Sequence, residues 1–388
     1  MNDTVRRWTF GLLPLLLLGV MITLFVRFEP MGFMEDTSPP VQELTIDRIT
    51  FPGEGTVELH VVNGGPEPVT VAQVMVDEAY WEHSIDGPRT IDRLGERTIT
   101  IPYGWVAGEP HEFTLVASTG VTFSREVPVA APTPEVNAQF LGAFALLGVY
   151  AGVVPVLIGL LWFPYLRDLS RRWLNFFLSL TVGLLLYLAV DGLVEAFEVA
   201  EMVPGAYQGV GLLALGVLGA VLALRAAGAA QESSDRGPSN LRLAYMIALG
   251  IGLHNLGEGL AIGAAYTAGE LALGSFLVIG FAAHNTTEGL AIVAPVADDR
   301  PSLWHLAAMG AVAGLPTVAG TWIGGFSYSP VATTLFLALG VGAILQVAWE
   351  IGTSTLRSAD QKVLVTPLNA AGLGLGLLVM YGTAIFMA

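Results

Sequence analysis

Hydrophobic and polar residues divide the chain into three stretches of different pattern. The first contains an uncharged apolar run at 8–26, preceded by Arg6 and Arg7, which is long enough to cross a hydrocarbon core as a helix. Such a run is either a retained anchor or a cleaved signal peptide. No small-residue cleavage site follows it, so we expect residues 1–28 to be an N-terminal membrane anchor with a cytoplasmic N-terminus.

The second stretch, residues 29–135, alternates apolar and polar residues in short runs rich in β-branched side chains. Turn sequences such as Pro52-Gly53 and Asp86-Gly87-Pro88 separate these runs. Six strands are predicted, at 44–50, 56–62, 69–76, 97–101, 112–117 and 122–129. We therefore expect a small all-β sandwich outside the cytoplasm, connected to the rest of the chain by a proline-rich link.

The third stretch, residues 136–388, consists mainly of apolar segments. Eight are long enough to span a bilayer: 136–163, 173–197, 205–225, 241–267, 270–297, 303–325, 330–353 and 362–387. The fold class predicted is a polytopic α-helical membrane protein, an eight-span bundle preceded by an anchor and a β-domain.

Composition supports this division and excludes several functions. The 388 residues are 53% hydrophobic and only 13% charged, whereas about a quarter of residues are charged in soluble proteins. The formal net charge is −16, so nucleic acid is not an expected partner, while the lipid bilayer is. The chain has no cysteine, which excludes disulfides and thiolate metal sites.

Basic residues predict the orientation of the spans. If the spans alternate from an outer β-domain, the short outer loops hold no arginine or lysine, as the positive-inside rule requires. The inner segments hold 11 basic residues: Arg6, Arg7, Arg167, Arg171, Arg172, Arg225, Arg236, Arg242, Arg300, Arg357 and Lys362. We expect a cell-membrane protein whose β-domain and C-terminus lie outside.

A motif with polar, ionisable residues occurs twice inside the predicted spans. The fourth span contains His254-Asn255-Leu256-Gly257-Glu258-Gly259, and the fifth contains His284-Asn285-Thr286-Thr287-Glu288-Gly289, 30 residues later. On a helix, His at i and Glu at i+4 lie about 40° apart, with Asn at i+1 on the same side. Because the two spans are antiparallel and join midway between the motifs, both motifs should lie at the same depth.

Two imidazoles, two carboxylates and two amides are thus expected to converge within the membrane. A charged carboxylate at the bilayer centre costs roughly 2.5–3.5 kcal/mol on insertion scales, so each Glu needs compensation. A divalent cation held by nitrogen and oxygen ligands would compensate both. A single motif could equally be a His–Glu hydrogen bond joining two helices, but two matched copies favour the metal.

Further acids occupy matched positions in two groups of three spans, 136–225 and 303–387. Asp191 follows Gly183 by eight residues, and Glu350 follows Gly342 by eight. The two groups enter the membrane from opposite sides, which is the arrangement of an inverted repeat and is typical of transporters.

These features resemble the ZIP (Zrt-, Irt-like) divalent-metal transporters over about 250 residues, excluding the anchor and the β-domain. The resemblance implies a primary site made by His254, Glu258, His284 and Glu288, with Asn255 and Asn285 contributing to a neighbouring one. It also implies a metal pathway lined from the second and seventh spans. The pathway residues would be Asp191, Glu195, Gln346 and Glu350.

This sequence departs from the family pattern at several positions. Gly257 and Thr287 precede the motif acids, where proline is common in the family, so helix kinks are expected to differ. Leu315 precedes Pro316 where the family commonly has Glu, and Trp349 stands where a His is frequent. The resemblance therefore implies one complete site and a weakened second one.

The expected function is transport of a divalent transition metal, with zinc as the favoured ion, toward the cytoplasm. Iron, manganese, cobalt and cadmium suit the same ligands, and no catalytic cofactor is expected. Two alternatives use the same cluster: an intramembrane metallohydrolase, and a transport-inactive metal receptor. The sequence permits a homodimer. Metal uptake should weaken below about pH 6 as the imidazoles protonate.

Histidines outside the motifs carry weaker signals. His60, His83 and His111 lie in the β-domain without ligand spacing, and we expect exposed surface histidines there rather than a metal-capture site assisted by Met31 and Met34. His305 begins the sixth span and is expected to have an interfacial role.

Overall fold

The structure is a computed structural model that describes residues 3–28, 41–232, 240–267, 271–299, 301–357 and 366–385. The predicted roles of Met31, Met34, Arg236, Arg300 and Lys362 concern residues outside these ranges. Contacts divide the chain into two compact units, Met1–Val41 and Gln42–Ala388. The first unit contains helix α1 (Asp3–Phe28), which covers the expected anchor and whose described apolar part is Leu12–Phe25.

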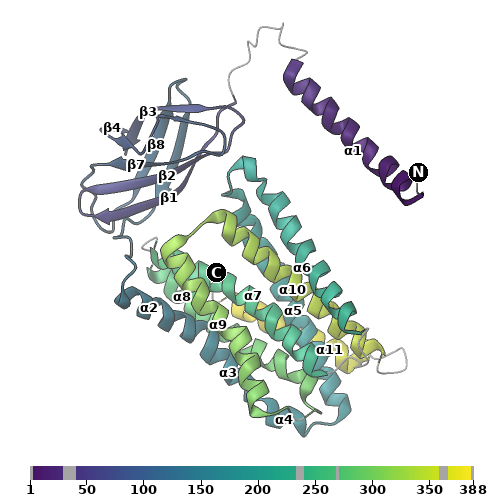
Figure 1. The fold of residues 1–388 in the computed structure, drawn as a ribbon. Helices are drawn as coiled ribbons and strands as arrows, with labels where there is room; N and C mark the ends of the chain where they lie inside the picture. The colour runs from purple at the N-terminus through teal and green to yellow at the C-terminus, as the bar shows by residue number, and fades with distance from the viewer. Residues whose placement is uncertain are drawn as a thin grey trace. The chain divides into compact units, whose positions relative to one another are not determined.

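The β-domain consists of two packed antiparallel sheets (Figure 1). One sheet has the order β1-β2-β7-β5, the other β4-β3-β8-β9, with β6 paired to β3. The strands are β1 (Leu44–Gly53), β2 (Thr56–Asn63), β3 (Val69–Val76), β4 (Ala79–Trp81), β5 (Ser84–Ile85), β6 (Thr90–Ile91), β7 (Glu96–Ile101), β8 (His111–Ala117) and β9 (Thr122–Val127). All six predicted strands are present.

Alternation of side chains explains this sandwich. In β3, Val69, Val71, Val74 and Val76 are buried, and they share one hydrophobic core with residues of both sheets such as Ile99. A register shift between β3 and β8 at 71–73 lets Val71 and Val74 both face inward. The short strands β4, β5 and β6 were not predicted because they are only two or three residues long.

The third stretch is helical, and eight of the described helical segments are long and apolar enough to cross a membrane. Its helices are α2 (Ala138–Gly148), α3 (Val154–Leu160), α4 (Phe163–Arg167), α5 (Arg171–Glu201), α6 (Gly209–Glu232), α7 (Asn240–Thr267), α8 (Leu271–Val293), α9 (Leu303–Ser327), α10 (Pro330–Arg357) and α11 (Pro367–Ile385). The short helical turns are η1 (Val149–Val153), η2 (Gly205–Tyr207) and η3 (Ala294–Val296). The chain is thus a polytopic helical protein with an added β region, as predicted.

The first span departs from a single regular helix. Between α2 and α3 the backbone forms the π-helical turn η1, in which the N–H of Val154 bonds to the carbonyl of Val149. Pro155 lies immediately after this turn and cannot donate a backbone hydrogen bond. The chain then turns after Leu160 into the short helix α4.

Glycines set the closest helix contacts in the bundle. Gly259 of α7 lies against Gly320 of α9, and Gly289 of α8 lies against Gly159 of α3, in each case backbone to backbone. A methyl group added at Gly259 or Gly289 would come within 2.2 or 2.3 Å of a carbonyl oxygen on the facing helix. These contacts determine the positions of α7 and α8 in the bundle.

Candidate functional site

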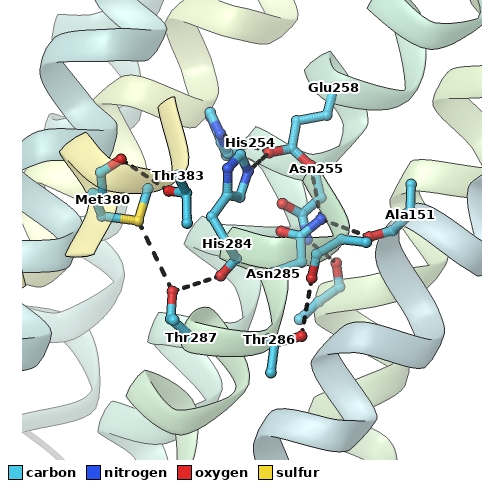
Figure 2. A network of polar contacts seen from close by, with 12 residues as sticks. Ala151, His254, Asn255, Glu258, His284, Asn285, Thr286, Thr287, Met380 and Thr383 are labelled. Atoms are coloured by element: carbon cyan, nitrogen blue, oxygen red, sulfur yellow. Dashed lines mark hydrogen bonds and ion pairs between the residues drawn. The ribbon is translucent and has the colours of Figure 1, made fainter. Parts of the chain in front are cut away.

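The polar cluster forms where α7 and α8 pack against each other (Figure 2). Helix α7 supplies His254 and Glu258, and α8 supplies His284 and Glu288. Each residue offers one nitrogen or oxygen atom such that these atoms all lie within 4.8 Å of one another. The convergence expected from the doubled motif is therefore present in the folded chain.

Glu258 lies at the centre of the hydrogen bonding. Its Oε1 is 3.2 Å from Nε2 of His254 and at hydrogen-bonding distance from Nε2 of His284. Its Oε2 accepts a hydrogen bond from Nδ2 of Asn285 at 2.9 Å. Two of these three partners come from α8, so Glu258 links the two helices.

Asn255 and Asn285 are bound to the neighbouring backbone. Nδ2 of Asn255 donates to the carbonyl of Ala313 in α9 at 3.1 Å, and Nδ2 of Asn285 donates to that of Ala151 in η1 at 2.9 Å. Figure 2 shows the second of these bonds beside the imidazole of His284. Both amides therefore have a fixed orientation at the edge of the cluster.

Several buried polar atoms of the cluster have no hydrogen-bond partner. Within the described part of the chain, both carboxylate oxygens of Glu288 are unpaired, as are Nδ1 of His254 and His284 and Oδ1 of Asn255 and Asn285. None of the six residues is more than 3% exposed. Four of these unpaired atoms are oxygens that can only accept, so the cluster has more acceptors than donors.

An excess of buried acceptors is costly unless positive charge is supplied. Leaving one buried polar group unpaired costs about 1–3 kcal/mol, and an ionised carboxylate costs more. Imidazole nitrogen and carboxylate oxygen are ligands of zinc at about 2.0–2.2 Å. Ligand atoms already within 4.8 Å of one another need to move only slightly to surround one such ion. The donor set thus fits a divalent transition metal.

Other helices enclose the cluster through small residues. A methyl group added at Gly192 of α5 would lie 3.5 Å from two ring atoms of His254, and one added at Gly340 of α10 would lie 2.9 Å from its Cα. Helix α7 runs unbroken through Gly257, where an added methyl group would meet the side chain of Leu337. The absence of proline before Glu258 therefore leaves α7 a continuous helix.

The predicted pathway residues lie outside the four-residue cluster. Asp191 and Glu195 are half-buried on α5, on either side of Gly192 and hence of His254. Gln346 is buried in α10. Glu350, one turn further along α10, forms an ion pair of 3.1 Å with Arg242 at the start of α7. The structure thus places Asp191 and Glu195 on the helix that packs against His254 through Gly192, and it pairs Glu350 with Arg242.

Leu315 of α9 and Trp349 of α10 both lie on the outer surface of the bundle. Leu315 is 54% exposed and Trp349 is 60% exposed. Neither belongs to the cluster found among the described residues.

The remaining histidines do not join the cluster. His111 is only 5% exposed, and its Nδ1 lies 2.8 Å from Asp77, so the expectation of an exposed side chain was wrong for this residue. The strand alternation of β8 places it on the inward face. His60 is half-buried between Arg48 and Thr98, His83 is also half-buried, and His305 lies 2.9 Å from the hydroxyl of Tyr245.

Sequence reasoning missed the groups that hold the site in place. These are the carbonyls of Ala151 and Ala313, the ion pair of Arg242, and the contact of Thr287 with the sulfur of Met380 in α11. One signal was present in the sequence: Pro155 and Pro316 interrupt backbone hydrogen bonding close to the two carbonyls.

Comparison with known proteins adds no identification, since no family model and no curated protein matches this chain.

Proposed function

We propose that this protein transports a divalent transition metal across a membrane through the cluster of His254, Glu258, His284 and Glu288. The observation that carries the proposal is a buried set of nitrogen and oxygen ligands with unpaired acceptor atoms, held between two membrane-length helices. Groups of this kind inside a membrane are functional by default, because their burial is costly. A bound cation would explain why hydrogen-bond acceptors outnumber donors in the cluster, because the unpaired oxygens would coordinate it.

The packing of the other spans supports a transporter. Gly183 of α5 lies against Gly376 of α11, and Gly342 of α10 lies against the carbonyl of Val217 in α6. Each glycine thus joins the second span of one group to the third span of the other. This reciprocal pairing is what an inverted repeat of 136–225 and 303–387 would produce, with the site near its centre.

The resemblance to ZIP transporters adds the direction and the ion to the proposal. It favours zinc and movement toward the cytoplasm, with the β-domain outside the cell membrane. The ligands themselves suit Zn²⁺, Fe²⁺, Co²⁺, Mn²⁺ and Cd²⁺. Under this proposal Asn255 and Asn285 add oxygen ligands, while Asp191 and Glu195 attract the cation toward His254.

Transport is tested with the purified full chain in liposomes that enclose a fluorescent zinc indicator. Glu288→Gln removes the carboxylate that lacks partners in the fold, so uptake should fall at least about tenfold while the protein stays folded. Glu198→Gln is the matched control, because Glu198 is exposed on α5. Uptake by Glu288→Gln equal to that of Glu198→Gln would defeat the proposal.

The same preparation separates the alternatives. Metal flux without any added organic substrate supports transport. Tight zinc binding without flux would instead indicate a receptor, and hydrolysis of a lipid or peptide without flux would indicate a metallohydrolase.

A further inference from the structure

A proline and a glycine four residues apart lie beside each copy of the motif. In the first span, Pro155 precedes Gly159, which contacts Gly289 of α8. In the sixth span, Pro316 precedes Gly320, which contacts Gly259 of α7. The helix facing each motif thus has the same local pattern, although the two spans are far apart in the sequence.

The prolines change the hydrogen bonding of the backbone next to them. Ala151 lies four residues before Pro155, so its carbonyl cannot receive the regular α-helical bond, and the backbone forms the π turn η1 there. In α9 the corresponding carbonyl is that of Val312, four residues before Pro316, whereas the regular donor of Ala313 is the N–H of Thr317. Pro155 therefore removes the regular donor of the carbonyl that Asn285 uses, and Pro316 removes that of the carbonyl next to the one that Asn255 uses.

Both motif asparagines donate to backbone carbonyls beside the prolines. Asn285 donates to Ala151 and Asn255 donates to Ala313, each through Nδ2. Because Nδ2 and Oδ1 belong to one planar amide, a bond that fixes Nδ2 also fixes Oδ1. Nδ2 of Asn285 is also 2.9 Å from Glu258, which keeps the whole amide at the cluster.

The remaining amide oxygens accept no hydrogen bond from any residue that the structure describes. These atoms are Oδ1 of Asn255 and Oδ1 of Asn285, and both side chains are fully buried. A free asparagine could rotate to exchange its oxygen and nitrogen, but here the rotation would bring Oδ1 against a carbonyl oxygen. The backbone carbonyl thus determines which end of each amide is offered to the cluster.

We propose that Pro155 is a positioning residue that frees the carbonyl of Ala151 to anchor Asn285, so that Oδ1 of Asn285 is presented to the bound metal. This inference rests on the proposed metal site and extends it to a residue that touches no ion. Partners that orient a metal ligand typically account for 10–100-fold in affinity. Prolines that only bend their helices would act independently of the asparagines.

The test is a set of double-mutant cycles on the purified full chain, with the dissociation constants of Zn²⁺ and Mn²⁺ measured by competition with a chromophoric chelator. Pro155→Ala restores the N–H that can pair with Ala151, and should weaken binding about 10–100-fold. The same change should have no further effect in an Asn285→Ala background.

Crossed pairs, which combine a proline and an asparagine from different copies of the pattern, serve as controls. Pro155→Ala combined with Asn255→Ala should multiply the two losses, because these residues belong to different copies. Equal coupling in matched and crossed pairs would overturn the positioning role. Thermal unfolding of each variant without metal verifies that it is folded.

Asn285→Asp gives an answer even if the proline variants do not fold. Aspartate keeps an oxygen and adds charge, which alone would strengthen binding, but it cannot donate to Ala151. We expect Asn285→Asp to bind Zn²⁺ no more tightly than the wild type, and binding at least tenfold tighter would overturn the proposal. If the wild type binds no Zn²⁺, both the proposed metal site and the positioning role are wrong. If the wild type binds Zn²⁺ and Glu288→Gln lowers the affinity, but Pro155→Ala and Asn285→Ala show no coupling, only the positioning role is wrong.

Discussion

Substitution of Gly259 by alanine tests whether the site depends on the close backbone contact between α7 and α9. The added methyl group would lie 2.2 Å from the carbonyl oxygen of Thr317 and 2.9 Å from Cα of Gly320, both backbone atoms of α9. Ordinary contact begins at 3.4 Å, so the two helices must separate by about 1 Å. The neighbouring Glu258 would move with α7.

The expected magnitude follows from overpacking. Forcing an extra methyl group into a well-packed interface typically costs about 1–3 kcal/mol. Gly250→Ala in the same helix is the matched control, because its new methyl group would meet nothing closer than 3.5 Å. In a helix interior that control should be neutral or stabilising by up to about 1 kcal/mol.

The assay is equilibrium unfolding in mixed micelles with increasing sodium dodecyl sulfate, followed by zinc uptake in liposomes. Gly259→Ala should unfold earlier than Gly250→Ala and transport more slowly, since the ligands of α7 are displaced. The reasoning is refuted if the two variants are equally stable and equally active.

Three further predictions concern other parts of the molecule. The single substitutions Arg242→Gln and Glu350→Gln should each lower the free energy of unfolding in the same micelle assay. The double variant should reveal a coupling energy of about 1 kcal/mol between the two residues. If the two losses are strictly additive, the ion pair contributes nothing to stability. In the β-domain, burial and then the charge of Arg48 lower the pKa of His60 from 6.5, against an opposing effect of nearby acids. The stability contributed by the neutral ring is therefore complete above pH 6.5 and lost as pH falls through the lowered folded pKa. Hydrogen exchange of β2 and β7 amides, corrected for intrinsic rates, should rise with acid in the wild type and rise less in His60→Gln. Zinc affinity should fall as the pH is lowered from 7.5 to 5.5, because protons compete with the metal for the imidazoles, and an affinity that stays unchanged over this range would contradict nitrogen ligation.

Periodicity predicted most of the fold because local patterns determine it. The eight apolar segments and the six longer strands follow from run length and alternation. The interruption at η1 was missed, since hydropathy is the same for a regular and a π-helical turn. Strand β4 was missed because Asp77 and Glu78 reverse the chain with positive φ angles, in a turn without glycine.

The site was partly predictable for the same reason. The spacing of His, Asn and Glu placed them on one helix face, and the doubling predicted their convergence. The anchoring of Asn285 on Ala151 joins residues 134 positions apart, and the pairing of Glu350 with Arg242 joins residues 108 apart. Contacts at such separations depend on how the spans pack, which no single segment encodes.

The two motif acids differ in their hydrogen bonding, so the two copies of the motif should tolerate substitution of the acid to different degrees. Glu258 links α7 to α8 through His284 and Asn285, whereas neither oxygen of Glu288 accepts a hydrogen bond from a described residue. Loss of the first acid would loosen the architecture, while loss of the second would remove a charge and leave the architecture intact. Substitutions in the two copies would thus be limited by different requirements. Those at Glu258 would be limited by the stability of the protein, and those at Glu288 by the proposed binding of metal.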